Sequence, residues 1–105
     1  MSDNGRRFRM ILRIQVKPGT EREFEQTWLG IAGDVSNQPG NIEQWLMKSA
    51  DEPSVFHVVS DWVDEATFRE FSRSDHHLEH RSRLAPYRQD GAISTMRVLH
   101  HLEAK

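Results

Sequence analysis

The side chains best suited to chemistry in this sequence are histidines, arginines and large aromatic rings. Histidine gains or loses a proton near neutral pH, so it can act as an acid or a base. Arginine stabilises an anionic oxygen, and tryptophan or phenylalanine rings stack on a flat molecule. The candidates of these three kinds are His57, His76, Arg13, Arg97, Trp28, Trp45, Trp62, Phe68 and Phe71. Together they could bind a flat aromatic molecule, take a proton from it and stabilise the anion.

Each candidate also has a purely structural explanation. A histidine on a strand, such as His57, is more often a hydrogen-bonded structural residue than a base, and His76 at a helix start could satisfy backbone groups. Trp28 falls on the apolar face of a predicted helix, a position typical of the core. Arg13 and Arg97 could pair with carboxylates across a dimer. Both explanations stay open for these positions.

The string HHLEH, residues 76–80, raises the question of a metal. His76 and His80 are four residues apart and would project from one helical face, and Glu79 completes the inverted zinc-protease pattern. A third ligand and a substrate cleft are not visible in the sequence, and cysteine is absent. We therefore predict a solvated helix face and no metal.

Length and composition favour one small domain. The chain has 105 residues and no linker rich in Pro, Gly or Ser, so we predict a single domain, 1–105, with a flexible tail at 1–7 and a folded part at 8–102. A net charge of −2 gives no basic field for nucleic acid. The absence of a signal peptide or a long apolar run predicts a cytoplasmic protein without membrane contact.

The first part of the chain predicts a strand followed by a helix. Residues 8–16 alternate between apolar and polar side chains over most of their length, as a strand with one buried face does. Thr20 is a candidate N-cap, and Glu23 would complete a capping box with it. Apolar residues then recur at helical spacing, and the helix is expected to end between Gly33 and Asn37.

The second part predicts a hairpin, a helical region and a last strand. Residues 42–49 and 55–61 read as two strands with a tight connection, the second of them central in the sheet. Asp64 and Ser74 are candidate caps of two short helices, and Pro86 is expected to end the second. A turn at residues 89–91 and a strand over residues 92–102 complete the pattern.

The order β-α-β-β-α-β is typical of a ferredoxin-like α+β fold, a four-stranded antiparallel sheet with helices on one face. The other face is too apolar to stay solvated and too charged for an ordinary core. A second copy of the chain would cover it, so we predict a homodimer. The side chains expected on that face are Ile11, Leu46, Val59, Leu99, Arg13, Gln44, His57 and Arg97.

Three stretches resemble the antibiotic biosynthesis monooxygenase family of small dimeric α+β barrels. KPGTEREFEQTW is similar to the family's proline-glycine turn and first helix, and PGNIEQWLMKSADEPSVFHVVSDW to its second and third strands. DEATFREFSRSDHH resembles its signature of an acidic helix start and then a small residue before a histidine, here His76. The resemblance covers residues 8–100 and implies the dimeric α+β barrel fold.

Members of this family include cofactor-independent oxygenases that convert an anthrone-type aromatic polyketide to a quinone with O2. The resemblance implies a monooxygenase-like tailoring enzyme of antibiotic or pigment biosynthesis, which oxidises an aromatic polyketide with O2 and needs no cofactor. The residues predicted to be catalytic are then His76, His57 and Trp62. Those predicted to bind the substrate are Trp45, Phe68, Phe71, Arg13, Arg97 and Trp28.

The sequence departs from the family at one place that matters for chemistry. The polyketide oxygenases use an asparagine and a tryptophan near the start of the second helix, where this chain has Val63, Asp64 and Glu65, with Phe68 further on. Haem-degrading relatives carry an asparagine on the first strand, and residues 8–16 contain none. Two alternatives stay open: a polyketide cyclase, and a non-catalytic accessory dimer that binds an aromatic metabolite.

Overall fold

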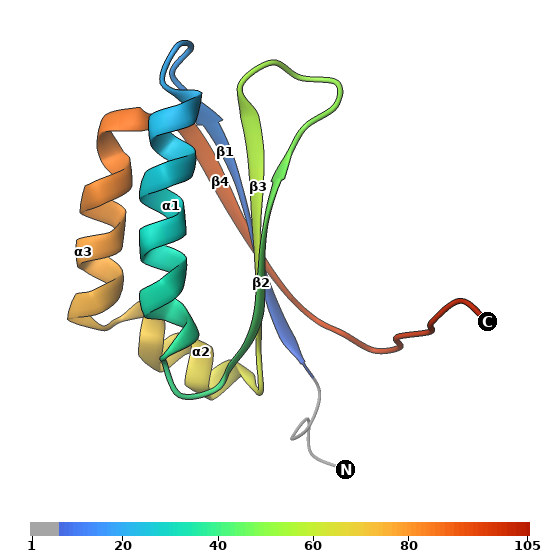
Figure 1. The fold of residues 1–105 in the computed structure, drawn as a ribbon. Coiled ribbons are helices and arrows are strands. Elements are labelled where there is room, and N and C mark those ends of the chain that lie inside the picture. The colour runs from blue at the N-terminus through green and yellow to red at the C-terminus, as the bar shows by residue number, and fades with distance from the viewer. Residues whose placement is uncertain (1–6) are drawn as a thin grey trace.

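The computed structural model describes residues 7–105, which form a sheet with helices against one of its faces (Figure 1). The elements are β1 (Phe8–Val16), α1 (Glu21–Ser36), β2 (Asn41–Lys48), β3 (Val55–Trp62), α2 (Glu65–Ser72), α3 (Asp75–Leu84), η1 (Ala85–Tyr87) and β4 (Arg88–Arg97). The strands pair antiparallel in the order β2-β3-β1-β4. This is the predicted ferredoxin-like arrangement, with β3 inside the sheet.

The described part of the chain begins at Arg7, beside the sheet, and ends in a segment beyond it. The tail predicted for residues 1–7 lies outside the described residues except for Arg7, which pairs with Glu43 and Asp61. After β4 the last residues extend away from the sheet (Figure 1). Within residues 7–105, no helix has the length and apolar character that a membrane span requires.

Local sequence explains the starts of α2 and α3. The Asp64 carboxylate accepts a hydrogen bond of 2.8 Å from the Thr67 N–H, and the Ser74 hydroxyl accepts one of 3.3 Å from the His77 N–H. Both cap residues have extended backbones, which aim their side chains at the free N–H groups of the first turn. The predicted caps at Asp64 and Ser74 are confirmed.

The capping box predicted at Thr20 and Glu23 is wrong. The Thr20 hydroxyl donates to the Lys17 carbonyl at 2.7 Å and makes no cap bond, because its backbone (φ −111°, ψ 10°) is not extended. Glu21 instead accepts hydrogen bonds from the Gly19 N–H and from the Ser54 hydroxyl. The start of α1 is therefore held by the turn and by a distant residue.

The predicted bounds of the last strand are also wrong. Residues 89–91 are part of β4 rather than a turn, and the strand ends at Arg97 instead of residue 102. Pairing with β1 explains both ends of β4, because Arg88 pairs with Val16 and Arg97 pairs with Phe8. A bulge between Gln15 and Val16 allows the pairing to reach Arg88.

The sheet face without helices is called the open face here, and its composition differs in part from the prediction. Leu46 pairs with Val58 and Gln44 with Ser60, which puts both on the helix-covered face. Arg97 pairs with Phe8 on that same face, and Leu99 lies beyond β4. The prediction placed β2 and β4 in the wrong phase. Side chains of the open face include Arg9, Ile11, Arg13, Trp45, Met47, His57, Val59, Asp61 and Met96.

Candidate functional site

A cavity of about 130 Å³ lies between the helix-covered face of the sheet and helices α1, α2 and α3. Apolar and aromatic side chains form most of its wall. The strands contribute Met10, Leu12, Gln44, Val58, Ser60, Trp62 and Ile93, and the helices contribute Trp28, Ile31, Val35, Phe68, Phe71, Ser72, His77, His80, Arg81 and Leu84. Apolar walls with a few polar groups are the usual lining of a small-molecule site.

Trp62 is the centre of the aromatic wall. It is 1% exposed, and its indole stacks on the Phe71 ring with centroids 4.9 Å apart and planes 27° apart. The Phe68 ring meets the indole edge-on at 5.8 Å. The indole N–H donates to the Ser60 hydroxyl at 3.0 Å, which fixes the orientation of the ring. Trp62 thereby orders the wall, and the partly exposed Phe71 ring is the one that can stack on a flat ligand.

Two imidazoles, His77 and His80, also line the cavity. His80 is 5% exposed, and its Nε2 lies 3.4 Å from the Asp34 carboxylate on α1. His77 is half-buried and presents its edge to the Phe71 ring, with centroids 5.5 Å apart. Burial lowers the pKa of His77, and the charges of Arg81 and His80 lower it further. The cavity therefore contains basic nitrogen within an apolar surround.

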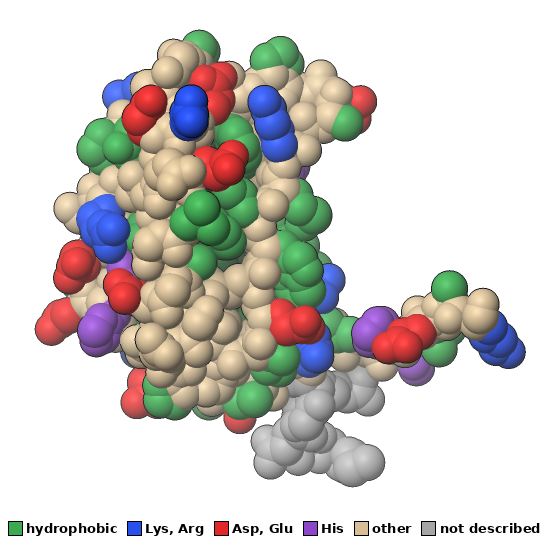
Figure 2. All heavy atoms as spheres, in the orientation of Figure 1, with side chains coloured by type: hydrophobic (Ala, Val, Ile, Leu, Met, Phe, Trp, Pro, Cys, Tyr) green, Lys and Arg blue, Asp and Glu red, His purple; other side chains and the backbone are tan. Residues whose placement is uncertain are grey.

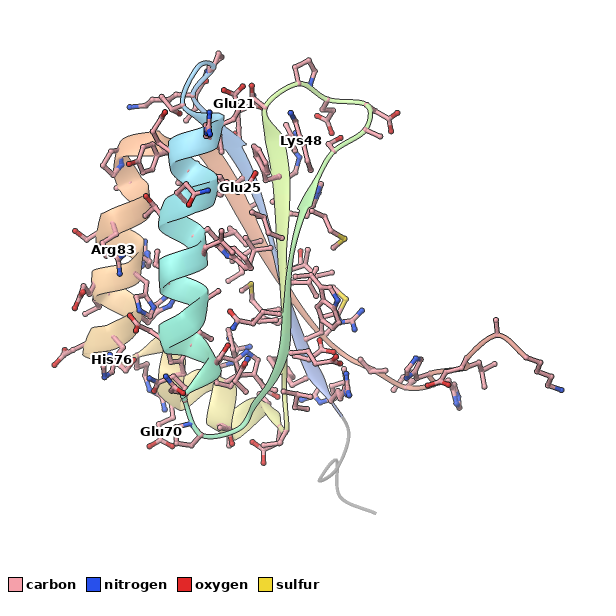
Figure 3. All side chains as sticks on the ribbon, viewed as in Figure 1. Glu21, Glu25, Lys48, Glu70, His76 and Arg83 are labelled. Atoms are coloured by element: carbon pink, nitrogen blue, oxygen red, sulfur yellow. The ribbon has the colours of Figure 1, made fainter. Side chains whose placement is uncertain are left out.

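Four of the residues predicted from the sequence as site residues meet in this cavity: Trp28, Trp62, Phe68 and Phe71. His76 does not line it and is exposed on α3 (Figure 3). The His76 and His80 ring centroids are 6.5 Å apart. Among residues 7–105, no group of three or more His, Cys, Asp or Glu side chains is arranged to hold a metal ion.

The other four predicted site residues lie elsewhere. His57, Arg13 and Trp45 are on the open face, where Arg13 pairs with Glu52 at 2.6 Å and Trp45 lies under the Arg9 guanidinium. Arg97 is exposed on the edge strand β4.

Arg97 pairs with Glu65 at the start of α2. The sheet thus separates the predicted site residues into two groups, one inside the cavity and one outside it.

Sequence reasoning missed His77, His80 and Asp34 as site residues. The available signal was helical spacing, because His77, His80 and Leu84 recur on one face of α3 in the way apolar residues of a packed helix do. Because two of these three residues are histidines and not apolar residues, the sequence pattern does not indicate a buried helix face. Asp34 gives no local signal, since only the packing of α1 beside α3 brings it near His80.

The open face has a polar cluster of its own around Asp61. The Asp61 side chain is 0% exposed, and its carboxylate accepts hydrogen bonds from Arg9 at 2.7 and 2.9 Å and from Arg7 at 3.1 Å. Burial acts to raise the pKa of Asp61, but the hydrogen bonds from Arg9 and Arg7 outweigh it and the pKa is lowered. This cluster holds strand β3 to β1 and the chain before it.

A groove between α1 and β2 borders the cavity. Apolar atoms are visible along it in Figure 2, and its lining includes Leu46 and Phe56. Glu21, Glu25 and Lys48 surround its upper end in Figure 3. Trp28 and Gln44 belong to the lining of both the groove and the cavity, and the Gln44 amide donates to the Ala32 carbonyl at 2.9 Å.

Comparison with solved structures shows the same fold in other proteins. SnoaB, a cofactor-independent oxygenase from Streptomyces nogalater, has a TM-score of 0.83 and 20% identity, over 94% of this chain and 99% of that one. A conserved protein from Methanosarcina mazei has a TM-score of 0.80 and 22% identity, over 90% of this chain and 95% of that one. At these identities the similarity concerns the fold.

Sequence comparison gives relatives and a family. Protein SchA of Streptomyces halstedii is 29% identical over 84 residues, 80% of this chain and 22% of that protein. The 42.8 kDa protein in the whiE locus of Streptomyces coelicolor is 30% identical over 76 residues, 72% of this chain and 19% of that protein. The chain thus spans about a fifth of the length of the curated relatives it matches. The model of the antibiotic biosynthesis monooxygenase family matches residues 7–83, and the chain belongs to that family.

Proposed function

We propose that this protein is a cofactor-independent monooxygenase that oxidises a phenolic aromatic polyketide of the anthrone type with O2. The observation that carries the proposal is the apolar cavity, in which a rigid aromatic wall and two imidazoles face the same space. The family match supports it. The shared fold with SnoaB, a cofactor-independent oxygenase, is consistent with the same reaction class.

The reaction needs a base, an apolar site and O2. A base removes a proton from the substrate CH2 group, and the electron pair delocalises through the ring system onto the oxygen of the anthrone carbonyl. The carbanion carbon bonds to O2, and the peroxide takes up a proton. Loss of the second C–H proton breaks the O–O bond, which leaves a carbonyl and releases water. The carbon loses four electrons and O2 gains four, so no further oxidant is required.

The described side chains supply what this sequence of steps asks for. The stacked rings of Trp62 and Phe71 hold the flat substrate, and Phe68 and Trp28 complete the aromatic enclosure. The apolar wall excludes water from the carbanion, which would otherwise be reprotonated. The groove between α1 and β2 is the entry route, because Trp28 and Gln44 border both spaces.

We also propose that two copies pair through the open face. Ile11, Trp45, Met47 and Met96 place apolar surface there, and the helices cover only the opposite face. In that dimer His57, Arg13 and Trp45 lie at the subunit contact. Sedimentation equilibrium at micromolar concentration should give twice the chain mass of 12.3 kDa. A mass of one chain would overturn the dimer.

The oxygenase is tested with dithranol, a stable anthrone, in air-saturated buffer treated with a chelator and containing no flavin or haem. Quinone absorbance should rise faster than in buffer alone, with one O2 consumed per quinone formed. Phe71→Ala should raise KM about tenfold, because about 1.4 kcal/mol of stacking is lost. Leu78→Ala, an exposed site on α3, is the matched control.

The outcomes separate the oxygenase from the two alternatives. Dithranol binding without quinone formation above the buffer rate would overturn the oxygenase and favour the accessory binding protein. A ring-closed product formed from a linear polyketide without O2 uptake would favour the cyclase.

A further inference from the structure

Within the proposed reaction, on which this inference rests, we propose that His80 is the catalytic base, that its Nδ1 takes the substrate proton, and that Asp34 positions it. The His80 side chain is nearly completely buried at the wall of the cavity. Its Nδ1 is enclosed and has no hydrogen-bond partner among residues 7–105. Buried polar atoms nearly always have a partner, because an unsatisfied one is costly. Nδ1 is not exposed to the empty cavity, so a bound substrate would have to displace its neighbours to reach it, and the substrate proton would then provide that partner.

The packing of α3 on α1 determines which nitrogen of the His80 ring is proposed to accept the substrate proton. His80 Nε2 lies 3.4 Å from Asp34 Oδ2, a distance that allows the carboxylate to attract the Nε2 proton and that can shorten when a ligand binds. With the proton on Nε2, Nδ1 carries the lone pair and is an acceptor. The carboxylate therefore selects the tautomer that the reaction needs, and it also stabilises the imidazolium formed on proton uptake.

The charged groups around His80 come from two helices. Asp34 on α1 is the acidic one, and its carboxylate also lies 4.0 Å from Arg83 Nη1. On α3, Arg81 and His77 lie beside it, and burial lowers the pKa of His77.

His76 approaches from the exposed side of α3 with its ring centroid 6.5 Å away, and α2 contributes the uncharged Phe71 ring at 6.2 Å. The strand residues that line the cavity carry no charge. Asp34 is therefore the acidic group placed to compensate a positive charge on His80.

The proton transfer to His80 needs no oxidant or other co-reactant. The substrate C–H bond breaks, its electron pair stays on the substrate, and the proton moves to His80 Nδ1. The imidazolium then returns a proton to the peroxide formed by addition of O2. The same nitrogen then accepts the second C–H proton and passes it to the departing hydroxide, which leaves as water, so the histidine ends each cycle in its starting tautomer.

The test compares His80→Gln, which hydrogen-bonds but does not titrate, with the matched control His101→Gln at an exposed position outside the sheet. We expect kcat for dithranol to fall by about a hundredfold or more in His80→Gln and to stay unchanged in His101→Gln. Binding of the product 1,8-dihydroxyanthraquinone, followed by tryptophan fluorescence, should be retained by His80→Gln, which would show that the cavity is intact.

Asp34 is tested as a positioning residue by nitrogen-15 NMR of the His80 ring, together with kcat. Asp34→Ala should lower kcat and reduce the share of His80 rings that carry their proton on Nε2, because the carboxylate 3.4 Å from Nε2 is gone. Asp34→Glu should restore the wild-type tautomer. A purely structural role for Asp34 would lower kcat without changing the tautomer, and that result would overturn the role assigned to it.

The outcomes distinguish this inference from the proposed function. Wild-type turnover together with unchanged kcat in His80→Gln would overturn the role of His80 and leave the oxygenase standing. Wild-type protein that forms no quinone above buffer would overturn both. Nitrogen-15 NMR of the histidine rings gives an independent check, since the unliganded protein should show the proton of His80 on Nε2, and a proton on Nδ1 would overturn the dyad.

Discussion

The two faces of the sheet bury two adjacent residues of β3 through different interactions: apolar packing on one face and ion pairs on the other. In β3, Trp62 points to the helix-covered face and Asp61 to the open face, and both are almost fully buried, at 1% and 0% exposure. Trp62 packs among Phe68 and Phe71, whereas Asp61 is enclosed by Arg9 and Arg7. The helix-covered face contains the cavity, and the strand residues that line it carry no charge. The other keeps charge and apolar surface side by side.

This difference shows which face of the sheet is covered by elements of the same chain. The covered face has its helices, its aromatic wall and the imidazoles of His77 and His80 within one chain. The open face has no helix packed on it (Figure 1), and Met47 on this face is 47% exposed. Stability should therefore depend mostly on the covered face, and association should depend on the open face.

The largest expected effect comes from the covered face away from the cavity. Phe24 is 0% exposed and packs on Phe56 with ring centroids 5.0 Å apart. Phe24→Ala should lower the free energy of unfolding by about 3–5 kcal/mol, because it leaves a void in the core. Urea unfolding followed by circular dichroism measures this loss. Leu29→Ala on the exposed side of α1 should change it by about 0.5 kcal/mol at most, and equal losses would contradict the comparison.

The next effect concerns the buried charge of the open face. Arg9→Met keeps the aliphatic stem but removes two hydrogen bonds to Asp61, and it should lower the free energy of unfolding at neutral pH by about 1–3 kcal/mol. Arg13→Met, which breaks the exposed pair with Glu52, should cost about 1 kcal/mol or less.

The stability difference between wild type and Arg9→Met should depend on pH. The pKa of Asp61 is lower in the folded than in the unfolded protein, so its stabilisation is complete above the ordinary aspartate pKa of about 3.9 and is lost as the pH falls through the folded value. In Arg9→Met the folded pKa rises, so the gap between wild type and variant should narrow on acidification. Urea titrations from neutral pH to about pH 3 measure this, and a gap that widens would contradict the account.

The smallest expected effect is on association. Met47 is 47% exposed on the open face, and Met47→Glu places a charge where the second copy is proposed to pack. The dimer dissociation constant should rise about tenfold, which corresponds to about 1.4 kcal/mol. Leu78→Glu, on the outer side of the helical layer, is the control and should leave the dissociation constant unchanged. Sedimentation equilibrium gives both values, and equal effects of the two substitutions would contradict pairing through the open face.

Local signals made the elements and two of the caps predictable. Asp64 and Ser74 act within three residues of their own position, so the short sequence around them determines the bond. Thr20 differs, because the neighbouring Glu21 binds Ser54 from a distant loop. The phase of β2 was not predictable, since apolar residues occur on both of its faces and only pairing with β3 selects one.

The candidate site also has a part that could be predicted from the sequence and a part that could not. Trp62, Phe68 and Phe71 were predictable as a group because they lie close in sequence at a strand end and on one helix. The choice between His76 and His80 was not, because both lie on α3 and the rotation of that helix against α1 decides which is buried.

By itself the sequence determined the order of strands and helices and the supply of aromatic rings and histidines, because alternation, capping and helical spacing act over a few residues. Only the tertiary structure decided that His80 is enclosed beside Asp34, while His57 and Arg13 lie on the opposite side of the sheet. The physical reason is that burial and pairing depend on segments far apart in the chain, and these meet only when the helices pack on the sheet.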